Sequence, residues 1–162
     1  MGTQQILLIV LSVIIVGAAI AVGIQMFNSQ AYSANKSAIA ADAQSFASQI
    51  VQFYKTPKSQ GGAGGDLTGL DAADVAGFIG FMAGSAGADW DADEYGIKND
   101  NGIYTITSVT PSATAGADET VEITGIGTEE RDGKSPKIVT TITFPACEIT
   151  AEASDEAVAS DE

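Results

Sequence analysis

The hydrophobic pattern of the chain begins with an unbroken apolar run. Residues 6–24 read ILLIVLSVIIVGAAIAVGI and contain one hydroxyl, that of Ser12, and no charge. At 1.5 Å per residue this run makes a helix of about 28 Å, close to the thickness of the hydrocarbon core of a bilayer. A helix that is apolar on every face has to be covered by lipid or by other protein. The run therefore predicts a segment that lies in a membrane, among other helices, or in each in turn.

The pattern then becomes one-sided. Residues 25–54 contain neither glycine nor proline, and their apolar positions recur at a 4-3-4-3 spacing that is typical of one helix face. These positions are Ile39, Ala43, Phe46, Ile50 and Phe53. Thr56 precedes Pro57, which disfavours the α region and ends the helix. We expect one helix over residues 1–55, with 1–27 as a membrane or filament-core half and 28–55 as an amphipathic half.

The remainder predicts a small α+β domain over residues 56–150. Asp71 is a suitable N-cap for a short helix within residues 67–82. Further on, four segments show the period-two alternation of strands, and Asn-Gly and Asp-Gly turns lie between some of them. The four segments are residues 95–98, 103–109, 121–127 and 137–144. Short connections favour a four-stranded antiparallel meander, on which the long helix would pack.

The amino-acid composition argues against several kinds of partner and site. The chain has 7 basic and 21 acidic residues, a net charge of −14, so we expect no nucleic acid partner. It has no histidine and a single cysteine, Cys147, which we interpret as a small buried residue in a strand, with an intermolecular disulfide as the alternative. Without a Cys/His set or a nucleophile paired with a base, we expect neither an enzyme nor a bound cofactor. Residues 151–162, rich in Ala, Ser, Asp and Glu, predict a mobile acidic tail.

One loop has a pattern that resembles a calcium ligand set. Asp89, Asp91 and Asp93 alternate like the first ligands of an EF-hand loop. Glu94 then stands where that loop needs glycine, and Asp100 stands where it needs a bidentate glutamate. A solvated loop and a weak Ca²⁺ site both remain open.

The apolar run also carries small residues four positions apart, Gly17 with Ala21 and Ala19 with Gly23. This spacing lets helix backbones approach closely, although glycine and alanine are also common in membrane helices. The two glycines are the expected places for a bend. The residues that we expect to form the membrane and assembly surface are Gln5, Ile6, Leu7, Leu8, Ile9, Val10, Leu11, Val13, Ile14, Ile15, Val16, Gly17, Ala21, Gly23 and Ile24.

Together these features resemble type IV pilins, in particular a group of bacterial pilin-like proteins that start MGxQQ before an apolar run. The resemblance rests on the start of the chain, on residues 53–57 (FYKTP) and on residues 61–65 (GGAGG); the strands match only in pattern. It implies a subunit that is stored in the inner membrane, processed by a prepilin peptidase and exported by the pilus assembly machinery. The product would be a homopolymeric helical filament on the cell surface, with this chain as its major pilin.

The chain departs from that family at its N-terminus. Pilins carry a glutamate at mature position five, whereas this position is Gln5 if Met1 is the first mature residue and Leu7 if cleavage follows Gly2. The proline common in the apolar half of the family's helix is absent, as is a second cysteine. Two other functions fit the same plan: a minor pseudopilin of a type II secretion system, and a single-pass membrane-anchored binding module that never polymerises.

Overall fold

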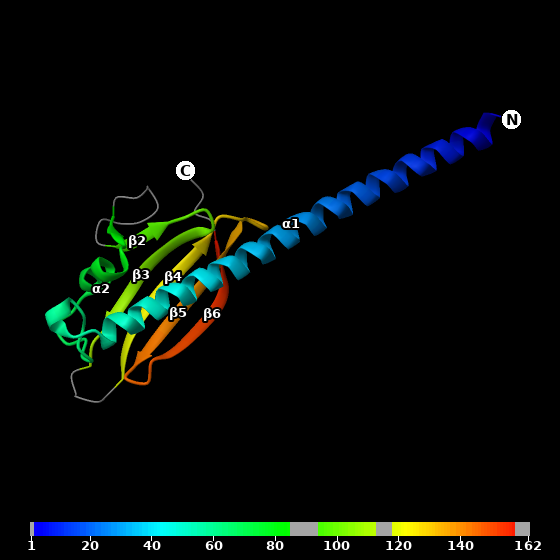
Figure 1. Cartoon of the computed structure of the whole chain (residues 1–162). Coiled ribbons are helices and arrows are strands. Elements are labelled where there is room, and N and C mark those ends of the chain that lie inside the picture. Colours follow the sequence, from blue (N-terminus) through cyan, green and yellow to red (C-terminus); the bar gives the residue numbers. More distant parts are fainter. Residues whose placement is uncertain (1, 85–93, 113–117, 158–162) are drawn as a thin grey trace.

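The computed structural model describes residues 2–84, 94–112 and 118–157, and it has the α+β class that the sequence predicts. A long helix, α1, projects far beyond a sheet-containing head, as Figure 1 shows. The elements are α1 (Gly2–Lys55), a 3₁₀ turn (Lys58–Gln60), α2 (Ala72–Ile79), β1 (Met82–Ala83), β2 (Tyr95–Lys98), β3 (Gly102–Thr110), β4 (Glu119–Gly127), β5 (Lys134–Phe144) and β6 (Glu148–Ala157). We call residues 2–28 of α1 the rod and the described part of residues 32–157 the head.

Helix α1 is continuous through Gly17 and Gly23 and ends at Lys55, next to the residue that precedes Pro57. The Gly-rich loop satisfies its last carbonyls: the amide of Ala63 donates to Phe53 O (3.0 Å) and that of Gly65 donates to Tyr54 O (2.8 Å). A helix leaves four such carbonyls without partners inside the helix. The loop is therefore the C-terminal cap of α1.

The sheet has six antiparallel strands in the order β1-β2-β3-β4-β5-β6, so the prediction of four strands was wrong. The four predicted segments correspond to β2–β5. The hairpin between β4 and β5 is tighter than its polar sequence suggests, because Asp132 and Gly133 both have positive φ and form a two-residue turn. Strand β5 therefore begins at Lys134 rather than Lys137.

The interpretation of residues 151–162 as a mobile tail was also wrong for residues 151–157, because they form most of β6; residues 158–162 lie outside the described residues. This strand pairs with β5 from Thr143↔Glu148 to Lys134↔Ala157. Its acidic side chains are partly compensated: Lys137 Nζ lies 2.6 Å from Glu156 Oε2, and the Asp155 carboxylate contacts α1. Opposite charges across neighbouring strands stabilise the pairing.

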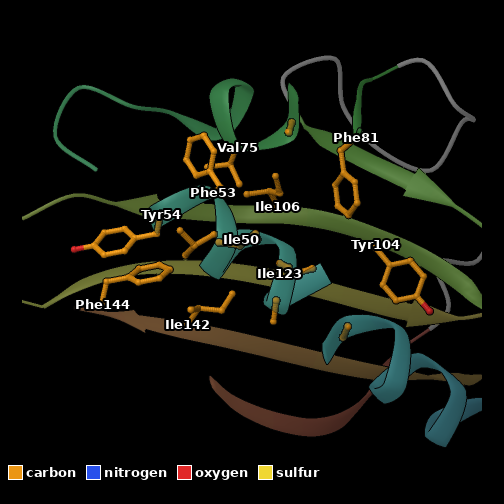
Figure 2. Packing of buried hydrophobic residues seen from close by; sticks show 14 of the residues in the cluster. Ile50, Phe53, Tyr54, Val75, Phe81, Tyr104, Ile106, Ile123, Ile142 and Phe144 are labelled. Atoms are coloured by element: carbon orange, nitrogen blue, oxygen red, sulfur yellow. The ribbon is translucent and has the colours of Figure 1, made fainter. Parts of the chain in front are cut away.

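The core lies between the amphipathic half of α1 and one face of the sheet. The predicted apolar stripe is confirmed, since Ile39, Ala43, Ile50 and Phe53 are buried and Phe46 is half-buried. Figure 2 shows Ile50 of α1 among the side chains of Ile106, Ile123 and Ile142, with Tyr54 stacked on Phe144 at a centroid distance of 4.1 Å.

Helix α2 closes one end of this core and confirms the predicted N-cap. Asp71 Oδ1 accepts hydrogen bonds from the amides of Ala73 (2.9 Å) and Asp74 (3.2 Å), and the Asp74 side chain accepts one from the Asp71 amide. This is a capping box, and the helix ends at Gly80 in the left-handed conformation.

Cys147 lies in the turn between β5 and β6 and is half-buried, so its assignment to a strand was wrong. It has a φ of 57°, and its side chain packs against the edge of the core.

Candidate assembly surface on helix α1

Every residue of the rod is exposed to the surroundings of the single chain. Its large apolar side chains range from 52% exposed at Leu11 to 72% at Phe27. All fifteen residues that the sequence assigns to the membrane and assembly surface lie on this segment, and Figure 1 shows it standing clear of the head. Among the described residues, α1 is the one helix whose length and composition would allow it to cross a membrane.

The surface of the rod is chemically uniform. Its one hydroxyl within residues 6–24 is satisfied inside the helix, because Ser12 Oγ donates to Ile9 O at 2.8 Å. A Cβ placed on Gly17 or Gly23 would have no atom within 4 Å apart from its own helix backbone and chain neighbours. These glycines therefore have no packing role within one copy of the chain, and any constraint on them has to come from outside it.

A polar cluster holds the base of the rod to the head. We call it the neck; it consists of Tyr32 and Lys36 on α1, Arg131 before the β4–β5 turn, and Asp155 on β6. The Tyr32 hydroxyl donates to Asp155 Oδ1 at 2.6 Å, and Lys36 Nζ lies 3.4 Å from the same oxygen. The guanidinium carbon of Arg131 lies 4.8 Å from the centre of the Tyr32 ring.

The electrostatics of the neck follow from these contacts. Burial, and then the hydrogen bond to Asp155, raises the pKa of Tyr32 to about 12, so its hydroxyl stays a donor at physiological pH. The same hydrogen bond, helped by Lys36, lowers the pKa of Asp155 below the usual value for an aspartate. The neck thus ties α1 to β6 at the point where the helix leaves the head.

A second polar cluster joins α1 to the turn between β2 and β3. Asp42 Oδ2 accepts hydrogen bonds from Asn99 Nδ2 (3.0 Å), Asn101 Nδ2 (2.8 Å) and the Tyr104 hydroxyl (2.8 Å). The bond from Asn101 is the main reason why the pKa of Asp42 lies below its usual range, with smaller contributions from Tyr104 and Asn99, although partial burial opposes this. Asn35 adds a bond from Nδ2 to Asn101 O at 2.8 Å.

Between these two clusters α1 lies directly on strand β4, over two glycines. A Cβ on Gly125 would lie 2.8 Å from Ile39 Cγ2, and one on Gly127 would overlap Asn35 Oδ1 and lie 2.5 Å from Ile39 Cδ1. Glycine inside a strand commonly marks such a close approach. The Gly-x-Gly pattern of residues 125–127 is a signal in the sequence that could have indicated this close approach.

The neck and the Asp42 cluster were also missed by the sequence analysis, since their partners are far apart along the chain. Tyr32 and Asp155 are separated by 123 positions, and Asp42 and Asn101 by 59. No local pattern connects such residues.

The other predicted site residues lie outside this surface. Asp89, Asp91 and Asp93 are outside the described residues, as is Met1; Gly2 is the first residue of α1. Among residues 2–84, 94–112 and 118–157, no group of three acidic or cysteine side chains is arranged to hold a metal ion. The calcium loop and the processing position stay predictions.

We compared the chain with known protein families, curated protein sequences and solved structures. No family model, no curated protein sequence and no solved structure matches the chain.

Proposed function

We propose that this chain is the structural subunit, the major pilin, of a type IV pilus-like filament. The observation that supports this most directly is the rod, an apolar helix with every side chain exposed, attached to a head that buries the amphipathic continuation of the same helix. In the membrane the rod is covered by lipid before assembly. In the filament it is covered by the rods of other copies, and the acidic heads face water.

The energetics favour one surface serving both environments. Burial of a large apolar side chain contributes about 1.5–3 kcal/mol, so covering the fifteen exposed large apolar side chains of the rod supplies tens of kcal/mol before the costs of association. Because the rod has no charge between Ile6 and Ile24, neither environment requires a buried ion. Gln4 and Gln5 are the polar side chains at its start, and they need hydrogen-bond partners wherever they are buried.

The sharpest test keeps the rod apolar and changes its shape. Gly17→Leu adds a bulky side chain at a position with no neighbour in the single chain, so the variant should fold and insert into the inner membrane like the wild type. If rods pack against each other, the added volume separates them, and the amount of this chain in sheared surface fibres should fall at least tenfold. Val16→Leu, one position away and already bulky, is the matched control and should assemble.

Three results separate the proposal from its rivals. Fibres composed mainly of this chain, lost in Gly17→Leu and kept in Val16→Leu, support a major pilin. Trace amounts of the chain in fibres built of another subunit favour a minor pseudopilin. The third result is that the chain stays entirely in the membrane of cells that also contain the assembly machinery and a prepilin peptidase. That result favours a single-pass anchored binding module and overturns the proposal.

A further inference from the structure

A groove lies on the head at the end that is far from the rod, between the last turns of α1 and the start of β6. We call it the distal groove. Its volume is about 790 Å³. Among its lining residues are Val51, Pro57, Cys147 and Ile149, with Ser48 and Lys55 also at its surface.

The groove exists because α1 lies over the centre of the sheet and leaves the start of β6 uncovered. Ile142 of β5 and Ile149 of β6 are directly opposite each other and so point to the same side of the sheet, toward α1. Ile142 is completely buried, whereas Ile149 is 38% exposed. An apolar side chain on the helix side of the sheet is therefore only partly covered in the single chain.

The charge of the groove differs from that of the head around it. The chain carries a net charge of −14, yet none of the described residues that line the groove is acidic, and Lys55 is the charged one among them. Half of its eight lining residues are apolar, and three of the four polar ones are uncharged. The groove therefore suits an occupant without charge, of about the size of a few large side chains.

We infer that the distal groove receives the rod of a second copy of this chain. This rests on the proposed function, since it names one contact inside the filament. The rod is uncharged over residues 6–24, has every apolar side chain exposed, and points away from its own head, so it cannot reach its own groove (Figure 1). A contact between two different surfaces of identical chains repeats from copy to copy, and it produces an open helical polymer when its rotation does not close a ring.

The dimensions of α1 agree with such a contact. The groove is level with residues 48–55 at the end of α1, and the centre of the apolar run is near residue 15. At 1.5 Å per residue, a parallel copy displaced along the helix axis by about 55 Å places its rod beside the groove. The part of α1 that the head covers, residues 32–55, is about 36 Å long, which is less than this displacement, so the covered parts of the two helices do not overlap along the axis.

Cys147, the one cysteine of the chain, lines the groove, so a disulfide cross-link to it can test this contact. Single cysteines are introduced along the rod of the full chain, at Val10→Cys, Ile14→Cys and Ala18→Cys, and assembled fibres are mildly oxidised. Because a disulfide requires Cα atoms about 4.4–6.8 Å apart, only a rod position that lies in the groove forms the bond. We expect a covalent dimer at one or two positions, with a peptide that joins the rod to Cys147.

Two controls make the result specific. The same rod cysteines in a Cys147→Ala background should lose that dimer, which separates it from rod-to-rod bonds. Thr107→Cys, exposed on the sheet face away from α1, should not replace Cys147 in that background. As a second measurement, maleimide labelling of Cys147 should be at least roughly tenfold slower in fibres than in the membrane-stored chain, since covering the groove hides the thiol.

The contrary results are distinct. Fibres in which rod cysteines join only to each other, and in which Cys147 labels as fast as in the membrane, overturn the groove contact and leave the proposed filament intact. Cys147 that labels as slowly in the membrane-stored chain as in fibres shows that assembly does not cover the groove, and this also overturns the contact. Absence of fibres from every variant and from the wild type overturns the filament itself.

Discussion

The close approach of α1 to strand β4 allows a quantitative prediction for the substitution Gly127→Ala. The new methyl group would overlap Asn35 Oδ1 and come within 2.5 Å of Ile39 Cδ1 and 2.7 Å of Pro136 Cγ. Overfilling a packed site of this kind costs about 1–3 kcal/mol. Displacing Asn35 also breaks its hydrogen bond to Asn101 O, at a further cost of about 0.5–1.5 kcal/mol. We expect a total loss of about 2–4 kcal/mol.

The assay is thermal unfolding of the full chain in detergent, followed by the near-ultraviolet circular dichroism of its tyrosines. For a head of about 125 residues, 1 kcal/mol corresponds to roughly 4 °C, so the Tm of Gly127→Ala should fall by about 8–15 °C. Gly77→Ala is the matched control. Gly77 is exposed on α2 with no atom near its Cβ position, and alanine there should hold or raise the Tm, since it favours helix by about 1 kcal/mol. A Gly127→Ala protein that melts within 2 °C of the wild type would refute the close approach of α1 to β4.

Two further predictions concern the polar clusters that hold α1. Asp42→Ala leaves three donors without their acceptor and should cost about 2–3 kcal/mol, measured in the same thermal assay. Because folding lowers the pKa of Asp42, its contribution is complete above the ordinary carboxyl pKa of about 4 and is lost as the pH falls through the lower folded value; the Tm difference between wild type and Asp42→Ala should therefore shrink below pH 4, and a constant difference would contradict the assignment. Tyr32→Phe removes the 2.6 Å hydrogen bond to Asp155 and should cost about 1 kcal/mol, with faster amide hydrogen exchange near Asp155 on β6 and unchanged exchange in α2. Equal acceleration in both elements would mean that the bond serves the whole head rather than the neck.

Helix α1 and the four central strands could be predicted from the sequence, whereas the last strand could not. The apolar run, the 4-3-4-3 stripe and Pro57 define α1 to within a residue at its C-terminus, because each is a local signal of helix content or of helix termination. The four central strands follow in the same way from their alternation. The rod, which is the main part of the candidate surface, was therefore predictable in full.

Strand β6 was not predictable by the same means. Its sequence EITAEASDEA is rich in residues that are depleted in strands, and its composition resembles that of a solvated tail. It is a strand because the neighbouring edge of β5 is long, because Cys147 turns the chain back with a positive φ, and because α1 supplies Tyr32 and Lys36 to hold Asp155. Tertiary contacts override the local preference, and the neck itself was hidden for the same reason.

The uniformity of the rod bears on how a filament of this chain would fix its geometry. Residues 6–24 offer apolar side chains on every face, so a copy that slides or rotates exchanges one apolar contact for another at little cost. A rod of this kind supplies binding energy but does little to fix the axial position of one copy relative to the next.

Under the proposed function, this register has to come from features that differ from place to place along the chain: Gln4 and Gln5 at its start, the small residues Gly17 and Ala21, and the distal groove. Substitutions that shorten apolar side chains of the rod should therefore weaken fibres without changing their helical symmetry, whereas substitutions in the groove should change the symmetry or make it variable. Under the proposed function, the two polar clusters and the close approach of α1 to Gly125 and Gly127 would serve the same purpose, since a head that moved freely relative to the rod could not transmit register to the next subunit.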